Sequence, residues 1–299
     1  RNMRIALFGK NVQKEDMPYM QTLLNQIAEK SDSILIYEDF FNEIHNYITL
    51  PKDCTLKLFS SRSPEDLQSD ILFSLGGDGT LLDTLSFCKG KDTAVLGINF
   101  GHLGFLTSVG REDCEGLLDN LENGHFKTEE HSLLKAEANG LSEIKYAINE
   151  ICVRRHSPSA LLETEVFVNG EYLSTYSSDG LILATPTGST AYSMSCGGPI
   201  ISPQSKCLCL TPIAPHNLTH RPLIIPEDSK IEFCISHSES CISLHSDSQN
   251  HILRSPAKIT ISKADFVLKL VRMENQTFFS AIRNKLMWGT NLRNAKKND

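Results

Sequence analysis

Hydrophobic and polar positions divide the chain into two parts with different periodicities. Between residue 3 and about residue 125, short apolar runs alternate with longer segments in which apolar residues recur every three or four positions. This alternation predicts strand-helix-strand units and a parallel sheet. The clearest expected helix covers residues 17–29, and the expected strands are residues 4–8, 34–37, 56–59, 71–75 and 94–98.

After about residue 125 the apolar runs are short and strand-like, with no long helix between them. Asn169-Gly170 predicts a type I′ hairpin turn, because both residues tolerate positive φ angles. The expected strands are residues 133–138, 146–154, 163–168, 171–176, 230–236, 241–245, 258–261 and 266–270. We therefore expect an α/β N-terminal domain with a parallel sheet and a β-rich, antiparallel, sandwich-like C-terminal domain. The first covers residues 1–125, joined by a closing helix within 277–299, and the second covers residues 126–276.

Length and charge narrow the classes of protein. A chain of 299 residues favours two domains, each with its own core. The 29 Lys and Arg against 36 Asp and Glu disfavour nucleic acid as a partner, because nucleic-acid surfaces need clustered cations. Residues 180–205 carry no charge, but their four Gly and three Pro exclude a membrane-spanning helix. The start lacks a signal peptide's apolar region, and nine scattered cysteines favour neither a disulfide framework nor a zinc site, so we expect a cytoplasmic protein.

The expected strand at residues 71–75 leads directly into Gly76-Gly77-Asp78-Gly79-Thr80. Glycine allows a backbone to approach phosphate closely, and a following helix N-terminus presents free N–H groups. The motif is neither Gly-x-Gly-x-x-Gly nor the Walker pattern. Asp78 either caps the helix that follows or has a functional role, in which it holds a metal ion or accepts a proton from an attacking hydroxyl. The flanking glycines favour the second interpretation, because a cap does not require them.

A second expected strand, residues 94–98, also ends in a glycine-interrupted loop, residues 99–106. In a parallel sheet both loops lie at the carboxyl edge, where ligands bind. His102 in this loop is a candidate substrate contact, although a lone loop histidine is more often structural or solvated.

Two later segments carry polar groups that suit nucleotide recognition. Asn149-Glu150 places an amide beside a carboxylate, but neighbouring strand residues point to opposite faces. Only one of them faces a site unless the strand bulges, and a plain surface carboxylate is the alternative. Residues 185–199 are rich in hydroxyls and include one tyrosine, which suits hydrogen bonding and stacking with adenine and ribose. The hydrolase pattern Gly-x-Ser-x-Gly is absent, which disfavours a serine nucleophile.

Taken together, these segments resemble the NAD kinase family. The five residues from Gly76 to Thr80 also resemble phosphofructokinases and lipid kinases. The longer, hydroxyl-rich segment is specific to the family, and Asn149-Glu150 falls between the two motifs in the family's order. The hydroxyl-rich segment reads Thr185-Pro186-Thr187-Gly188-Ser189-Thr190-Ala191-Tyr192-Ser193 and ends in Gly197-Gly198-Pro199, and Pro212-Ile213-Ala214-Pro215-His216 matches a further family segment.

The resemblance implies transfer of a phosphoryl group from ATP, or from polyphosphate, to the 2′-hydroxyl of the adenosine ribose of NAD, which yields NADP. Asp78 would be the general base, and Gly76, Gly77, Gly79 and Thr80 would contact the donor phosphates. The implied NAD-binding residues are Asp78, Gly79, Asn149, Glu150, Ser177, Asp179, Thr187, Thr190, Ala191, Tyr192, Ser193, Met194, Ser195, Ala214 and Gln249. No side chain is assigned to a metal ion, and Mg²⁺ is expected with ATP. The resemblance also implies a homodimer or homotetramer that binds NAD and ATP. From charge and composition we expect neither nucleic acid nor a membrane as partner.

Departures from the family pattern concern phosphate contacts and the choice between NAD and NADH. Asp83 and Ser177 stand where many members have a basic residue, and Asp247-Ser248-Gln249 stands in place of Asp-Gly-Gln.

Three alternative functions differ in the sequence features that they require. A lipid kinase has no use for the hydroxyl-rich segment, a dehydrogenase usually carries Gly-x-Gly-x-x-Gly, and a non-catalytic dinucleotide sensor does not need Asp78 between glycines.

Overall fold

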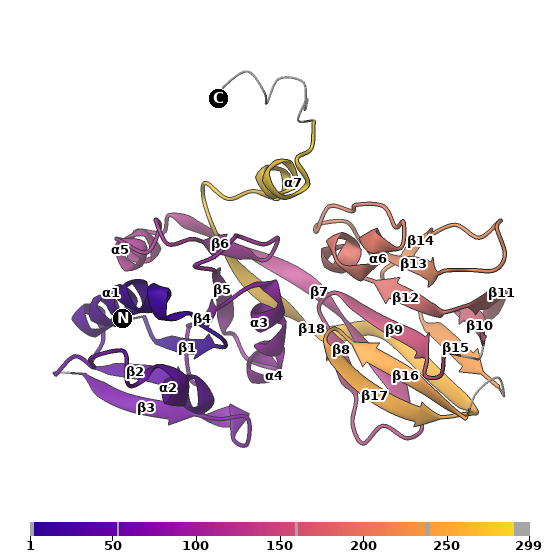
Figure 1. Cartoon of the computed structure of the whole chain (residues 1–299), viewed down its shortest axis with the longest axis horizontal. Coiled ribbons are helices and arrows are strands. Elements are labelled where there is room, and N and C mark those ends of the chain that lie inside the picture. Colours follow the sequence, from indigo (N-terminus) through magenta and orange to yellow (C-terminus); the bar gives the residue numbers. More distant parts are fainter. Residues whose placement is uncertain (1–2, 53, 159–160, 237–239, 290–299) are drawn as a thin grey trace. The chain divides into compact units, whose positions relative to one another are not determined.

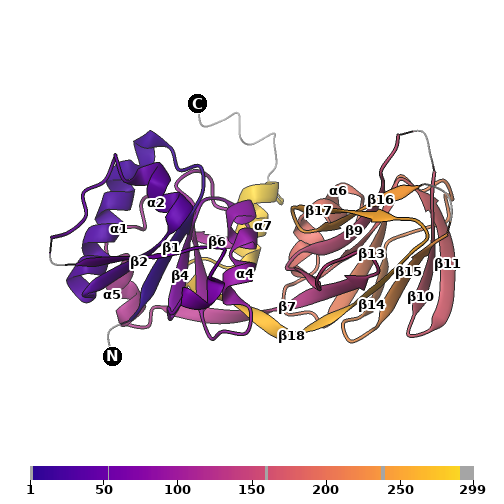
Figure 2. The same ribbon diagram turned by 90° about the horizontal axis from the view of Figure 1, so that it is seen from below.

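The computed structural model describes residues 3–52, 54–158, 161–236 and 240–289. The chain divides into two compact units, of which unit 1 contains residues 1–130 and 269–299 and unit 2 contains residues 131–268. Residues 290–299 of the expected closing segment lie outside the described residues. Figures 1 and 2 show the elements of each unit.

Unit 1 is built on a parallel sheet. Its strands occur in the order β3 (Thr55–Phe59), β2 (Ser33–Tyr37), β1 (Ile5–Gly9), β4 (Ile71–Leu75) and β5 (Ala94–Ile98). β6 (Thr107–Val109) and the end of β18 (Ala257–Met273) add to β5, also in parallel. Every residue of β1 and β4 is buried, as in a parallel sheet covered on both faces. The five strands expected from the sequence are all present.

Several helices of unit 1, among them α1 (Met17–Lys30), α2 (Glu38–Ile44) and α5 (Leu117–Glu122), bury apolar side chains. In α1 the buried residues recur every three or four positions, as the sequence pattern predicts, and α1 lies beside α5 (Figures 1 and 2). The chain continues through η1 (Lys14–Asp16), α2, η2 (Pro64–Asp66), α3 (Asp78–Asp83) and α4 (Leu85–Cys88), and closes with α7 (Phe278–Leu286). Since β1, β4 and β5 are parallel, the loops that follow Leu75 and Ile98 meet at one edge of the sheet.

Unit 2 consists of antiparallel strands in two layers. One sheet has the order β14 (Leu223–Pro226), β13 (Cys207–Ile213), β12 (Gly180–Ala184), β9 (Glu150–Arg155), β16 (Cys241–Ser246) and β17 (Gln249–Arg254). The other layer contains β11 (Glu171–Ser178), β10 (Leu162–Val168), β15 (Ile231–Ile235) and the start of β18, with β7 (Phe126–Ala138) pairing β18 and β8 (Lys145–Ala147). Side chains from both layers, among them Val153, Leu183 and Phe233, form one buried apolar core. The expected β-rich second half is therefore confirmed.

The backbone angles test one local prediction directly. Asn169 and Gly170 have φ angles of 52° and 84°, as a type I′ turn between β10 and β11 requires. All nine cysteines are free. Among the described residues, no helix combines the length and apolar character needed to cross a bilayer.

Candidate functional site

Asp78 lies at the carboxyl edge of the unit 1 sheet, directly after β4. Its Oδ2 accepts the backbone N–H of Phe105 at 2.8 Å, and its Oδ1 accepts those of Leu106 and Thr107 at 3.1 and 3.2 Å. A carboxylate offers about four acceptor sites in total. The loop after β5 therefore fixes the orientation of this side chain and leaves one acceptor site, on Oδ2.

The interpretation of Asp78 as a helix cap is wrong. Asp78 is the first residue of α3, the N-cap position belongs to Gly77, and no side chain caps this helix. The carboxylate instead binds N–H groups that lie 27–29 residues further along the chain. This pairing is tertiary, which a local capping rule does not anticipate.

The glycines around Asp78 have different structural roles. Gly76 has a φ of 149°, and a Cβ there would lie 2.3 Å from Thr80 Oγ1. At Gly79 a Cβ would meet nothing within 4 Å, so the backbone is open to an approaching ligand. At Gly104 a Cβ would lie 1.9 Å from Asp78 Oδ1, so the loop can hold the carboxylate this closely only without a side chain. Gly104 lies in the second glycine loop, but its role is visible only in three dimensions.

A lysine that the sequence patterns do not single out lies near this edge of the sheet. Lys10, directly after β1, contacts Asp83 with its Nζ 2.9 Å from Oδ2. Asp83 is the residue that replaces a basic residue of many family members, and in this chain it pairs with a cation from another strand end. His102 is exposed, and its backbone carbonyl accepts a hydrogen bond from the Asn99 side chain.

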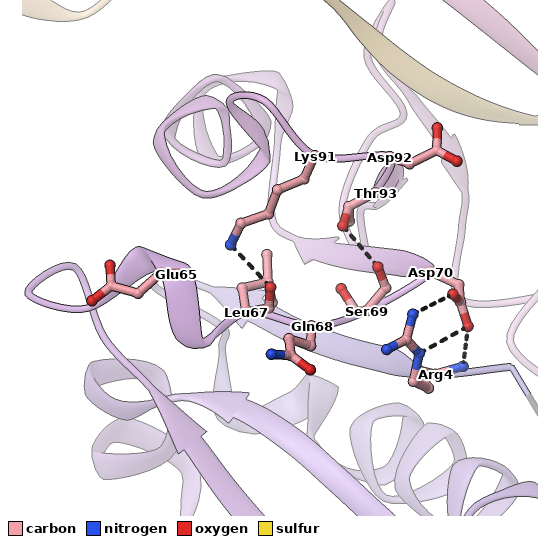
Figure 3. Close-up of a pocket in the computed structure, with 9 residues that line it drawn as sticks. All are labelled: Arg4, Glu65, Leu67, Gln68, Ser69, Asp70, Lys91, Asp92 and Thr93. Atoms are coloured by element: carbon pink, nitrogen blue, oxygen red, sulfur yellow. Dashed lines mark hydrogen bonds and ion pairs between the residues drawn. The ribbon is translucent and has the colours of Figure 1, made fainter.

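The opposite edge of the same sheet carries a pocket of about 600 Å³ (Figure 3). Its lining residues precede β1, β4 and β5, so the pocket is at the amino edge, away from Asp78. Arg4 pairs there with Asp70 at 2.9 Å, and Lys91 Nζ donates to the Leu67 carbonyl at 2.9 Å (Figure 3). Since both cations already have partners, this pocket is a poor candidate for binding a phosphate.

In unit 2, two of the predicted dinucleotide residues, Glu150 and Tyr192, lie on one face of the sheet that contains β9 and β12. Side chains alternate between faces along a strand, and the other face belongs to the large core. On the first face Cys152, Ile182 and Ala184 form a small apolar cluster, against which Tyr192 of α6 (Tyr192–Ser195) packs. Glu150 faces the same side, because it is two residues before Cys152 and pairs with Ala184. Adjacent apolar and polar groups of this kind suit the flat, amphipathic surface of a nucleoside.

Glu150 is buried and chemically unusual. Its side chain is 8% exposed, and its Oε2 has no hydrogen-bond partner. Burial, assisted by the nearby charge of Asp247, raises the pKa of Glu150 to about 8. The interpretation of Glu150 as a plain surface carboxylate is therefore wrong, and burial favours its protonated form, which can donate a hydrogen bond.

Asp247 fixes the backbone of the Asn149-Glu150 segment. Its carboxylate accepts the N–H groups of Ile148, Asn149 and Glu150 at 2.8, 2.8 and 3.1 Å, and its own N–H donates to the Glu150 carbonyl at 3.1 Å. Asp247 adopts a φ of 50°, which a non-glycine residue seldom does. This aspartate therefore ties the turn between β16 and β17 to the start of β9.

The hydroxyl-rich segment, residues 185–199, also contacts the backbone around Asn149. Thr185 Oγ1 donates to the Ile148 carbonyl at 2.6 Å and accepts the Gly188 N–H at 3.1 Å. A Cβ on Gly188 would lie 2.0 Å from the Asn149 carbonyl oxygen, so glycine allows this close approach. Part of the hydroxyl-rich segment forms the short helix η3 (Thr187–Thr190), which is followed by α6.

The remaining predicted NAD-binding residues differ in accessibility. Ser193 is fully buried, and its hydroxyl lies 2.8 Å from that of Thr211, so it acts as a packing group in this structure. Thr187 is also buried and contacts His131 Nδ1 at 2.8 Å, while Asp179 pairs with Arg155 at 3.2 Å. Partly or fully exposed side chains belong to Ser177, Thr190, Ala191, Tyr192, Met194, Ser195, Ala214 and Gln249.

Arg154 adds a cation to this face that was not expected from the sequence. It follows Cys152 by two residues, and its guanidinium carbon lies 5.7 Å from the centroid of the Tyr192 ring. A Cβ on Gly180 would lie 2.5 Å from the Val153 carbonyl oxygen and 3.1 Å from Arg154 Cγ, so glycine there is required mainly by the neighbouring backbone. No local sequence signal distinguishes Arg154 from a solvated strand residue.

A resident metal ion has no protein cage in the described part of the chain. No group of three or more His, Cys, Asp or Glu side chains there is arranged to hold one. Mg²⁺ commonly binds through one or two carboxylates, several waters and the phosphates of a substrate.

Comparisons with known proteins agree with this arrangement of motifs. Residues 7–126 match the ATP-NAD kinase N-terminal domain, and residues 148–273 match the ATP-NAD kinase C-terminal domain. The chain belongs to the NAD kinase family. The NAD kinase of Flavobacterium johnsoniae is 38% identical over 98% of this chain and 100% of the relative. The NAD kinase of Cytophaga hutchinsonii is 36% identical over the same shares.

Solved structures of NAD kinases share the fold. Yeast NADH kinase complexed with NADH aligns with a TM-score of 0.87 and 23% identity, covering 97% of this chain and 89% of that one. The NAD kinase from Archaeoglobus fulgidus in complex with ATP aligns with a TM-score of 0.71 and 25% identity, covering 95% and 99%. The expected combination of an α/β part and a β-rich part is thus the NAD kinase architecture.

Proposed function

We propose that this NAD kinase transfers the terminal phosphoryl group of ATP to the 2′-hydroxyl of the adenosine ribose of NAD, with Asp78 as the acceptor of the hydroxyl proton. The bond between the terminal phosphorus and its bridging oxygen breaks, the 2′-oxygen forms a new bond to phosphorus, and ADP and NADP leave. The observation that carries the proposal is the Asp78 carboxylate, which three backbone N–H groups hold and which retains one acceptor site. A group aligned in advance suits phosphoryl transfer, which depends mainly on positioning and charge stabilisation.

The donor phosphates would lie over the glycines that precede and follow Asp78. The open backbone at Gly79 supports this placement, because nothing lies within 4 Å of where its side chain would be. Gly76, Gly77 and Thr80 belong to the same turn. Mg²⁺ would arrive with ATP and neutralise charge on the phosphates.

The dinucleotide would bind on the β9–β12 face of unit 2. Asn149 and Glu150 would recognise the adenosine ribose and its neighbouring groups, and a protonated Glu150 can donate a hydrogen bond to a substrate oxygen. Tyr192, Thr190, Ala191 and Ser195 would form the wall around the adenine. The other proposed contacts are Ser177, Asp179, Thr187, Ser193, Met194, Ala214 and Gln249. The family resemblance supports a homodimer or homotetramer, which light scattering measures.

The direct test is NADP formation by the purified chain. The protein is incubated with NAD, Mg²⁺ and either ATP or polyphosphate, and NADP is measured with an NADP-specific dehydrogenase. We expect Asp78→Asn to lower kcat by about 10²- to 10⁴-fold, because the variant cannot accept the proton, while NAD binding measured by calorimetry persists. Asp92→Asn, which removes a carboxylate that is 90% exposed at the amino edge, is the matched control. Near-normal turnover of Asp78→Asn removes Asp78 from the reaction, and no NADP from either donor refutes the proposed activity.

A further inference from the structure

The loop that holds Asp78 is itself held by the last residues of β18. Arg272 Nη2 donates to the Phe105 carbonyl at 2.6 Å, and Arg272 Nε donates to Glu129 Oε2 at 3.1 Å. The Arg272 side chain is only 11% exposed. A guanidinium buried to this degree depends on its acceptors, because removing a charge from water is costly unless hydrogen bonds replace the lost solvent.

A second contact from β18 lies on the other side of the N–H donors. Ser108 Oγ donates to the Val271 carbonyl at 3.3 Å, and Ser108 is 1% exposed. Of the three N–H groups that bind Asp78, those of Leu106 and Thr107 lie between these two contacts, and the third belongs to Phe105, whose carbonyl binds Arg272. Adjacent residues of β18 therefore fix both ends of the donor segment.

Phe105 links these elements through its backbone and its ring. Its N–H binds Asp78, and its carbonyl binds Arg272. Its ring centroid is 6.4 Å from that of Phe278 and 5.5 Å from Lys285 Nζ, both in α7. Displacement of the Phe105 carbonyl would therefore move the N–H of the same residue, which lies 2.8 Å from Asp78 Oδ2.

We propose that Arg272 is a positioning residue for phosphoryl transfer, which holds Asp78 in its reactive orientation through the carbonyl of Phe105. The inference rests on the proposed role of Asp78. The planar guanidinium donates to Phe105 and Glu129 simultaneously, which a lysine ammonium at the same position cannot do with the same geometry. Arg272 touches neither substrate nor reacting atoms, so its loss alters the orientation of Asp78 rather than the binding of NAD or ATP.

Kinetics of variants at Arg272 distinguish positioning from a purely structural role. We expect Arg272→Ala to lower kcat by about 10- to 100-fold, because a misplacement of about 1 Å at a catalytic group has an effect of this size. The KM values for NAD and ATP are expected to stay within about threefold, since the binding groups are untouched. Added guanidinium ion is expected to restore part of kcat in Arg272→Ala. Arg272→Lys, which retains the charge and fills most of the space, serves if the alanine variant does not fold, and its kcat is expected to lie between the two.

Arg4→Ala is the matched control, because it removes an arginine of the same unit that pairs with Asp70 at the opposite edge of the sheet. Its kcat is expected to match that of the wild type. The decisive measurement combines Arg272→Ala with Asp78→Asn in single-turnover experiments. If Arg272 acts through Asp78, the double variant is no slower than Asp78→Asn alone.

Three results would overturn the inference. They are an unchanged kcat in Arg272→Ala, a raised KM with unchanged kcat, and losses that multiply in the double variant. The turnover of the single variant Asp78→Asn tests the catalytic role of Asp78 separately. A fully active Asp78→Asn variant refutes the role of Asp78 and, with it, the positioning role of Arg272.

Discussion

Replacement of Gly104 by alanine is expected to separate turnover from dinucleotide binding. The added Cβ would lie 1.9 Å from Asp78 Oδ1 and 2.2 Å from its Cγ. The φ angle of Gly104 is outside the left-handed region, so alanine is acceptable to the backbone and the contact with Asp78 is the main effect. The loop resists retreat, because the Gly104 N–H donates to Thr107 Oγ1 at 2.6 Å. Asp78 is therefore the group that moves.

The size of the effect follows from the required displacement. Real Cβ contacts are essentially never shorter than 3.0 Å, so the 1.9 Å contact must lengthen by about 1.1 Å. A misplacement of about 1 Å can reduce a rate by about 100-fold. This corresponds to about 2.7 kcal/mol of transition-state stabilisation. We expect kcat to fall by about this factor.

Steady-state NADP formation and calorimetric binding of NAD test this expectation together. Gly104→Ala is expected to have a lower kcat and an NAD affinity close to that of the wild type, because the β9–β12 face is unchanged. Gly110→Ala is the control, since a Cβ there would have its nearest contact at 3.5 Å, from Asp113 Oδ2. A kcat for Gly104→Ala within twofold of the wild type refutes the reasoning, and so does an equal loss of activity in Gly110→Ala.

Two further predictions concern the Asn149-Glu150 segment. Asp247→Asn leaves one acceptor oxygen for the three N–H groups of residues 148–150. We therefore expect a raised KM for NAD and a free energy of unfolding, measured in urea, that is lower by at least about 2 kcal/mol. An unchanged KM and an unchanged stability would contradict this. The pKa of Glu150 rises from 4.5 to about 8 on folding, so the folded state retains its proton more strongly than the unfolded chain. Stability from this group is complete below pH 4.5 and is lost as the pH rises to 8. Glutamine does not ionise, so the melting temperature of Glu150→Gln is expected to rise relative to that of the wild type as the pH increases from 4.5 to 8. A difference in melting temperature that does not depend on pH would contradict the raised pKa of Glu150.

Much of the fold follows from local pattern. Short apolar runs and helical periodicity locate the five parallel strands and α1, and Asn169-Gly170 identifies a hairpin, because these features depend on neighbours in the chain. The Gly76–Thr80 turn is recognisable for the same reason. The capping interpretation of Asp78 fails, since the groups that bind its carboxylate come from another loop.

The contacts around the candidate site depend on distant residues. Asp247 reaches the N–H groups of Ile148 to Glu150 across 97–99 positions, and Arg272 reaches Phe105 across 167. Neither pairing leaves a periodic signal, because sheet topology rather than spacing brings the partners together. Burial likewise distinguishes Glu150, with its raised pKa, from an ordinary carboxylate on a strand.

The sequence by itself determined the two kinds of architecture, the family and the residue types available for phosphoryl transfer, because periodicity and short motifs are local properties of the chain. Only the tertiary structure decided that Gly104 must lack a side chain, that Asp78 retains one acceptor site, and that β18 fixes the loop around it. A carboxylate is oriented by the donors that surround it, and in this protein the donors to Asp78 lie 27–29 residues further along the chain.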